Sequence, residues 1–212
     1  MLYQILQYIK HLLNSKNQHG VHSPFVYNLV TKCFYQKTHH QLGLITGVNS
    51  KSAKLLYRVL NYCKPEHILE IGHFSSINSV AMSIENPKTN ITYLNNSTKV
   101  VEFLKTHFEK IGVVNPNFND NIKKFKPSEF DIVLFNLNNE IEPYLHCFEA
   151  LLPATHNNTI FIFNAIHSSK KMSKIWNSIK QHPKITVSID TYFLGFAFIR
   201  KEQAKEHFTI RV

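Results

Sequence analysis

The chain has 212 residues, of which 43% are hydrophobic and 18% charged, and this composition suits one globular domain rather than a disordered or fibrous chain. Its three scattered cysteines form no CxxC pair, which disfavours a disulfide framework or a zinc ribbon and favours a reducing, cytoplasmic compartment. The net charge of +10 admits polyanionic partners, but the lysines are spread along the chain, so we favour a small-molecule partner over nucleic acid.

The N-terminal segment is typical of an amphipathic helix. Its apolar residues follow helical spacing and are Leu2, Ile5, Leu6, Ile9, Leu12 and Leu13. No apolar run in the chain approaches the length of a bilayer span, and this segment lacks the continuous apolar region of a signal peptide. We therefore expect a helix packed on the domain and no membrane contact.

Two more helices are predicted before the sequence pattern changes at Pro65. Ser23 and Pro24 have the residue types of an N-cap and a first helical position, and that helix extends to Phe34. A loop over 36–49 precedes a second helix with apolar residues between Ala53 and Leu60. We assign residues 1–64 to an N-terminal helical extension and residues 65–212 to the main domain.

From Pro65 onward, short apolar strands alternate with helices, which predicts βαβ units and a parallel sheet. The strands are expected at 67–71, 90–94, 130–135 and 159–163, and the helices near 76–84, 100–111, 140–152 and 172–179. Two last strands, 184–192 and 196–200, are separated by three residues. That gap is too short for a crossover helix, so these strands should form an antiparallel hairpin. The predicted fold class is α/β, Rossmann-like and doubly wound.

Ligands of a doubly wound sheet bind beyond the carboxyl ends of its strands. After the first strand, Glu70 and Gly72 lead into a loop toward a helix, where glycine allows close backbone approach to a ligand. The loop lacks the further glycines of a dinucleotide fingerprint, which disfavours a nicotinamide enzyme. The following strands lead into Asn95, Asn136 and Asn164 in turn. These residues are the candidates for contact with a ligand.

Histidines provide the remaining candidates for chemistry. His167 follows the last parallel strand and could act as a general base, because imidazole titrates near neutral pH; a structural hydrogen bond that holds the loop is weighted equally. His19 and His22 could bind substrate or transfer a proton, although we favour a capped turn before Ser23. Trp176 is expected in the core.

Three segments resemble a family of bacterial class I S-adenosylmethionine-dependent methyltransferases. They are NSKNQHGVHSPFVYNLVTKCFY (14–35), FIFNAIHSSKKMSKIWNSIKQHPKITVSID (161–190) and RKEQAKEHFTIRV (200–212). The resemblance implies a mostly parallel seven-stranded sheet that ends in the antiparallel hairpin and binds S-adenosyl-L-methionine. On the family pattern the cofactor would contact Glu70, Gly72, His73, Ser75, Ser76, Asn95 and Asn136, with Asn95 at the ribose.

The chain departs from this family pattern at its acidic positions. Asn95, Asn136 and Asn164 replace carboxylates, and Ala165 replaces a fourth. Amides attract a divalent cation weakly and cannot act as a general base, so we predict no metal. Two functions follow: metal-independent methyl transfer to an unidentified acceptor, or a catalytically degenerate protein with a binding or regulatory role. A weaker third reading is RNA binding. No feature of the sequence indicates an oligomeric state.

Overall fold

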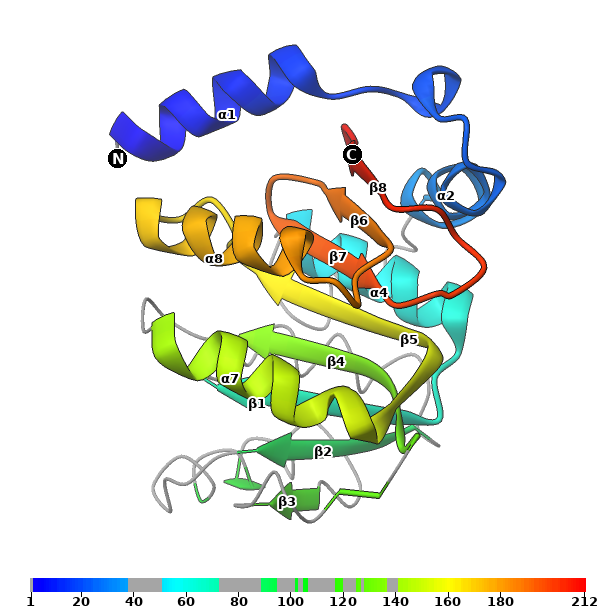
Figure 1. Ribbon diagram of the computed structural model, residues 1–212, viewed down its shortest axis with the longest axis vertical. Helices are drawn as coiled ribbons and strands as arrows, with labels where there is room; N and C mark the ends of the chain where they lie inside the picture. Colours follow the sequence, from blue (N-terminus) through cyan, green and yellow to red (C-terminus); the bar gives the residue numbers. More distant parts are fainter. Residues whose placement is uncertain are drawn as a thin grey trace.

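The central feature of the computed structural model is a mixed β-sheet (Figure 1). The structure describes residues 2–37, 51–72, 89–94, 117–119, 128–136 and 141–212, with a few isolated residues between them. Within these ranges the sheet has eight strands in the order β3-β2-β1-β4-β5-β7-β6-β8. The strands are β1 (His67–Gly72), β2 (Asn90–Leu94), β3 (Asn117–Asn119), β4 (Phe130–Asn136), β5 (Thr155–Asn164), β6 (Val187–Asp190), β7 (Leu194–Phe198) and β8 (Glu206–Thr209).

The strand pairing confirms the predicted fold class. β3, β2, β1, β4 and β5 pair in parallel, and β7 joins β5 and β6 in antiparallel fashion. The predicted seven-stranded sheet with its C-terminal hairpin is therefore present. An eighth strand, β8, extends the edge in parallel to β6. Neither β3 nor β8 was predicted as a strand from the residue pattern.

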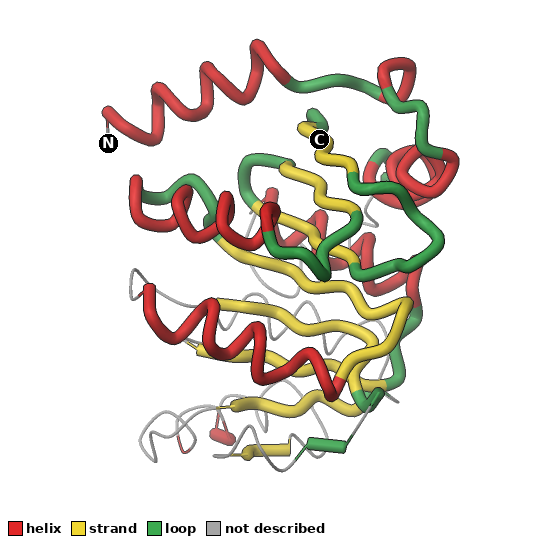
Figure 2. The backbone as a smooth tube through the Cα atoms, in the orientation of Figure 1, coloured by secondary structure: helices red, strands yellow, loops and turns green. Residues whose placement is uncertain are grey.

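Helices cover both faces of the sheet (Figure 2). They are α1 (Leu2–Asn14), α2 (Pro24–Leu29), its π-helical continuation η2 (Val30–Phe34), α4 (Lys51–Cys63), α7 (Ile141–Leu151) and α8 (Lys170–Gln181), with short 3₁₀ turns η1 (Gln18–Gly20) and η4 (Leu152–Ala154). One core cluster joins α2, η2 and α4 to the sheet, and a second joins α7 and α8 to the other face. Trp176 lies in the second cluster, which confirms its predicted core position. The division at residues 64 and 65 stays a prediction.

The hairpin between β6 and β7 turns earlier than predicted. Leu194 and Gly195 were expected in the turn, but they are the first residues of β7, and Gly195 pairs with Phe163 of β5. The turn instead occupies Thr191–Phe193, with Tyr192 in the left-handed region at φ 71°. The Thr191 N–H donates to the Leu194 carbonyl at 3.0 Å, which closes this turn. The strand boundaries from the sequence were therefore wrong by two residues or more here.

Gly195 is required where it lies because its Cα faces the indole ring of Trp176. A Cβ there would lie 2.8 Å from Cζ3 of that buried ring. We expect Gly195→Ala to lower the free energy of unfolding by about 1–3 kcal/mol, since the ring must move within a packed core. Gly20→Ala is the control, because its Cβ would meet only the flexible Lys16 side chain. Denaturant unfolding measures both, and equal midpoints would contradict the steric explanation.

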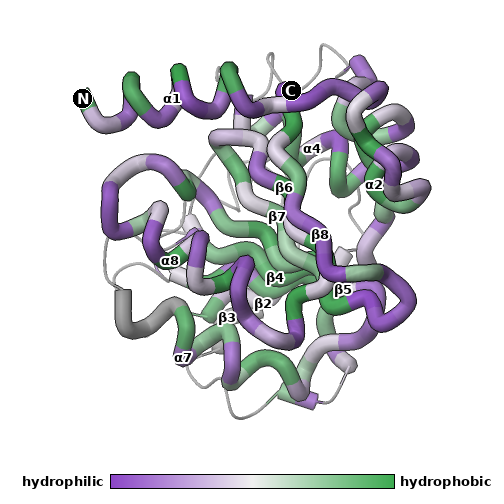
Figure 3. Tube along the Cα trace, turned by 45° about the horizontal axis from the view of Figure 1, so that its top comes forward, coloured by the Kyte–Doolittle hydropathy of each residue, from purple (hydrophilic) through white to green (hydrophobic). Residues whose placement is uncertain are grey.

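α1 forms as predicted but packs through the opposite face. Its apolar stripe is exposed, at 71% for Leu2, 50% for Ile5, 55% for Leu6, 48% for Ile9 and 81% for Leu13. In Figure 3 the hydrophobic segments of the α1 tube lie on the side of the helix away from the sheet. The helix contacts the domain through buried His11 and through Tyr8, whose ring packs edge-on to Tyr192 at 4.9 Å. In the part of the chain that the structure describes, no helix is long and apolar enough to cross a membrane.

Candidate functional site

Strand register brings three predicted site residues together at the carboxyl edge of the sheet. β1 and β4 pair Glu70 with Leu134 and Gly72 with Asn136. Side chains alternate along a strand, so Glu70 and Asn136 project from the same face, two residues apart in register. The pairing of Leu134 with Ile162 places Asn164 on that face as well, beside Asn136. The sequence predicted these positions individually, and the register explains why they meet.

The three side chains form one hydrogen-bonded relay. The Nδ2 group of Asn136 donates to Oε1 of Glu70 at 2.9 Å, and the Nδ2 group of Asn164 donates to Oδ1 of Asn136 at 2.6 Å. Glu70 is fully buried and Asn136 is 5% exposed. Since a carboxylate only accepts hydrogen bonds, the amide of Asn136 must turn its nitrogen toward Glu70. The relay therefore gives the buried carboxylate a neutral donor instead of a second charge.

The backbone at this edge adopts left-handed conformations. Gly72, which ends β1, has φ 100°, a region that side chains rarely adopt, so glycine is needed at this position. Ala165, directly after β5, has φ 54°, and its N–H donates to the Phe193 carbonyl at 2.9 Å. Non-glycine residues in this region cost of order 1–3 kcal/mol and cluster at functional sites. The strain thus coincides with the predicted site.

His167 contacts a carboxylate that the sequence analysis missed. Its Nε2 lies 2.8 Å from Oδ2 of Asp190, and its Nδ1 lies 3.1 Å from Oγ of Ser173. On the other side, Nδ1 of His11 approaches Oδ1 of Asp190 at 3.4 Å, an electrostatic contact rather than a well-formed hydrogen bond. Asp190 thus bridges two histidines from distant parts of the chain. The sequence could have indicated Asp190, because it is an acidic residue at the end of an apolar strand, directly before the hairpin turn.

Asp190 is held in its ionised form. Burial alone would raise the pKa of its carboxyl, but contacts with His11 and His167 and the Tyr192 N–H outweigh burial and leave the pKa far below the usual range. The Tyr192 N–H donates to Oδ1 at 2.9 Å. A charged Asp190 accepts from Nε2 of His167, so it fixes the orientation of that imidazole.

A pocket of about 380 Å³ opens beside this pair at the end of β5. It is lined by Gln4, Ser52, Asn164, Ala165, His167, Ser168, Tyr192 and Phe193. Tyr192 and Phe193, which are core residues in most such hairpins, are only half-buried and form one wall. The Tyr192 hydroxyl donates to the Gln4 carbonyl at 2.8 Å, which ties α1 to the pocket rim. The pocket has the dimensions of a small-molecule site.

Other predicted site residues are not placed at this edge. His73, Ser75, Ser76 and Asn95 lie outside the described residues. His19 and His22 are exposed in and after η1, and neither lines the pocket at the end of β5. Oδ1 of Asn17 accepts from the His19 N–H at 3.1 Å and caps η1, which is the capped turn before Ser23 that the sequence favoured, and the Ser23 hydroxyl accepts from the Val26 N–H at 3.4 Å as the N-cap of α2.

The described residues contain no set of side chains arranged to bind a metal ion. No group of three histidine, cysteine, aspartate or glutamate side chains there is arranged to hold an ion. The relay itself offers one carboxylate and two amides, a weak set for Mg²⁺. Metal independence stays a prediction, because part of the edge lies outside the described residues.

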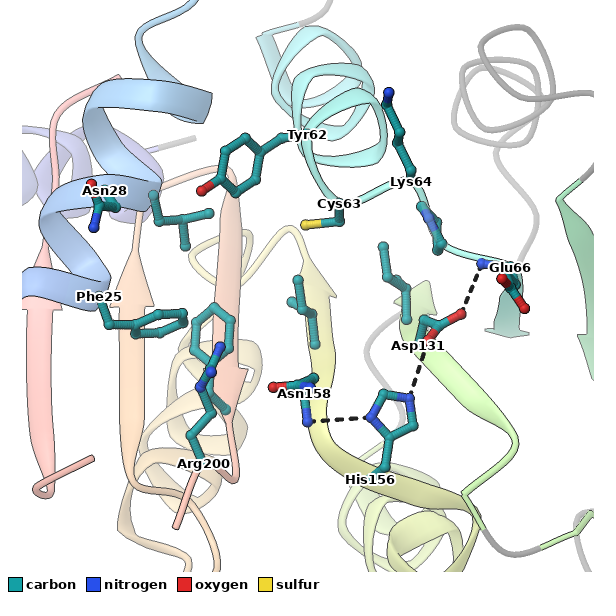
Figure 4. A pocket seen from close by; sticks show the side chains of 15 residues that line it. Phe25, Asn28, Tyr62, Cys63, Lys64, Glu66, Asp131, His156, Asn158 and Arg200 are labelled. Carbon is teal, nitrogen blue, oxygen red and sulfur yellow. Dashed lines mark hydrogen bonds and ion pairs between the residues drawn. The ribbon is translucent and has the colours of Figure 1, made fainter. Parts of the chain in front are cut away.

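A second, larger pocket of about 480 Å³ lies at the other end of the parallel strands, beside their amino ends (Figure 4). There, Oδ2 of Asp131 accepts the N–H groups of Glu66 and His67 at 2.8 and 2.9 Å, while His156 Nε2 lies 3.1 Å from Oδ1. These contacts hold the amino ends of β1 and β4. Because ligands of this fold bind beyond the carboxyl ends, we place the candidate site at the other edge.

Several solved structures share this architecture. A methyltransferase from Podospora anserina bound to SAH is 16% identical with a TM-score of 0.61, over 73% of this chain and 80% of that chain. An O-methyltransferase from Bacillus cereus in complex with SAH is 14% identical with a TM-score of 0.56, over 82% and 96%. A methyltransferase from Geobacter sulfurreducens is 11% identical with a TM-score of 0.58, over 92% and 96%. No family model matches the chain, and no curated protein matches its sequence. These likenesses show a shared class I methyltransferase fold.

Proposed function

We propose that the chain binds S-adenosyl-L-methionine at the carboxyl edge of β1 and β4 and transfers its methyl group, without a metal, to a small-molecule acceptor. The observation that carries this proposal is the convergence of Glu70, Gly72, Asn136 and Asn164 at one edge, beside a pocket lined by His167. The similar structures with bound SAH support the choice of cofactor.

The residues present fit such a cofactor in part. The left-handed Gly72 removes a Cβ where backbone would approach the ligand, and buried Glu70 supplies carboxyl oxygens behind the edge. His73, Ser75, Ser76 and Asn95 complete the proposed cofactor contacts, with Asn95 at the ribose. The cofactor supplies a methyl group already activated on a sulfonium. The protein then needs mainly to align the acceptor, which positioning alone can accelerate strongly.

His167 is the proposed group for the acceptor proton. Asp190 holds Nε2, so Nδ1 is the nitrogen available for proton transfer, and it now contacts Ser173. Ser173 also lies 3.2 Å from the Ile166 carbonyl and can rotate its hydroxyl toward it. The acceptor would have to displace the serine from Nδ1. Until that happens, His167 performs the structural role that the sequence weighed equally.

Cofactor titration with matched glutamate variants tests the proposal. Calorimetry should show micromolar binding of S-adenosyl-L-methionine to the wild-type protein. Glu70→Gln should weaken it about tenfold or more, because one carboxyl oxygen at the site is replaced by an amide NH2 group that can only donate. Glu66→Gln is the control, since Glu66 is exposed at the opposite edge. Unchanged affinity in Glu70→Gln would refute this placement of the cofactor, and no binding at millimolar cofactor would refute the proposal.

The relay favours one alternative, a catalytically degenerate protein with a binding or regulatory role. Hydrogen bonds join the side chains of Glu70, Asn136 and Asn164 to one another, so these contacts at the edge do not require a ligand. Absence of cofactor binding in the titration, with intact folding, would support this second function. Cofactor binding would favour the first.

A further inference from the structure

A separate cleft lies between α1 and α8, on the side of the molecule where these helices run past each other (Figure 1). Its volume is about 420 Å³. α8 contributes Lys170, Ser173, Lys174, Asn177 and Lys180, and α1 contributes Tyr3, Gln7, Lys10, His11 and Asn14. Each set follows helical spacing and occupies one helix face. The polar face of α1 therefore forms a wall of this cleft, while its apolar stripe points elsewhere.

The lining is strongly cationic. Four lysines, Lys10, Lys170, Lys174 and Lys180, share the cleft with a single carboxylate, Asp190. That carboxylate is already engaged by His11 and His167. None of the four lysines forms an ion pair within the described part of the chain. Asp190 is the one carboxylate that lines the cleft, so the positive charge of the four lysines is balanced only in part.

The lysines of α8 differ in whether they line the cleft, and Lys170 and Lys174 are exposed to solvent within it. Lys170 and Lys174 face the cleft, whereas their neighbour Lys171 does not line it. Lys180 is half-buried, and burial lowers its pKa, with nearby Lys10 adding to the effect and Asp190 opposing it. Like charges held at close range are unfavourable unless an anion screens them. Neutral donors such as Asn177 and Tyr3 complete a lining suited to oxygen acceptors.

We infer that this cleft binds the phosphate groups of a small ligand. Several ammonium groups around one cavity of this volume match a compact polyanion such as a diphosphate, for which lysine acts as a point charge. A flat surface for nucleic acid would instead distribute the charge along a backbone track. The site does not depend on the proposed methyl transfer, although His167 lines both this cleft and the pocket at the end of β5.

Calorimetric titration with pyrophosphate, at neutral pH and about 0.15 M salt, tests the cleft directly. We expect micromolar binding by the wild-type protein. Lys10→Gln/Lys174→Gln, which removes one charge from each wall, should raise Kd about tenfold or more. Lys184→Gln/Lys201→Gln removes the same charge at exposed positions outside the cleft and should change Kd less than about twofold. Thermal melts confirm that both double variants remain folded.

Further titrations, with ADP and with RNA, distinguish the kinds of ligand that could supply the phosphate groups. Tighter binding of ADP than of pyrophosphate would identify a nucleotide, and equal binding would identify recognition of phosphate alone; both support the site. No heat with millimolar pyrophosphate would overturn it, as would equal weakening in both lysine pairs, which indicates diffuse charge. A short single-stranded RNA that binds but is not displaced by pyrophosphate would overturn it in favour of nucleic acid. None of the pyrophosphate results depends on whether S-adenosyl-L-methionine binds.

Discussion

Asn136→Asp is expected to destabilise the protein by about 3–5 kcal/mol at neutral pH, because it places a second carboxylate against buried Glu70. Asn136 now donates to Oε1 of Glu70 at 2.9 Å, and an ionised aspartate at this position would have no donor to offer. Two buried carboxylates in contact cannot both ionise without a counterion. The same change at Asn158, which is exposed, adds equal charge and should have little effect.

The pH dependence of the unfolding free energy of Asn136→Asp tests whether charge repulsion causes the destabilisation. In the folded variant, repulsion and burial raise the pKa of the carboxyl pair above the unfolded value of about 4. The variant should therefore approach wild-type stability near and below that pH and lose it as pH rises through the folded pKa. Denaturant unfolding across this range measures the effect. A stability loss that does not change with pH would point to altered packing instead of charge.

The double variant Asn136→Asp/Asn164→Asp is expected to bind Mg²⁺. The double variant would place carboxylates at both amide positions of the relay beside Glu70, a set of hard oxygen ligands. Millimolar Mg²⁺ should then raise its melting temperature, while the wild-type protein should not respond. A wild-type response of similar size would contradict the view that the amides make this edge a poor cation site.

The parts of the fold that the sequence predicted are those with a strong local signal. β1, β2 and β4 are apolar runs bounded by polar residues, and their ends agree with the prediction to within a residue. β3 and β8 have no such signal. β3 is the three residues Asn117–Asn119, and β8 pairs with β6 through backbone contacts that a short mixed sequence does not reveal. Edge strands depend on the neighbouring strand more than on their own composition.

The contacts within the candidate site were also not predictable from local sequence patterns. Asn136 and Asn164 were found because they follow strands, but their shared hydrogen bond depends on strand register, which the local pattern of a single strand does not reveal. The orientation of α1 was missed for a related reason. Helical spacing of apolar residues predicts a helix, but not which face contacts the domain, and here His11 is the buried residue of α1. Asp190 became a candidate only when α1 and β6 were seen together.

Asp190→Asn is expected to lower the free energy of unfolding by about 2–4 kcal/mol at neutral pH, because it removes the charge that joins His11 and His167. The asparagine keeps the shape and can still accept from one ring nitrogen, so loss of charge dominates the effect. Glu202→Gln is the control. Its carboxyl also pairs with a cation, Arg200, and has a pKa lowered to about 2, chiefly by a hydrogen bond from Asn157, but it is exposed and should contribute little.

The wild-type protein and Asp190→Asn should converge in acid. The folded pKa of Asp190 lies below its unfolded value near 4, so its stabilising effect is fully present above that pH. It declines as pH falls toward the folded pKa, because protonation removes the same charge that the mutation removes. The difference in unfolding free energy should therefore be constant above about pH 5 and shrink below pH 4. A difference that persists undiminished in acid would show that Asp190 acts by shape, and that His167 is not held by its charge.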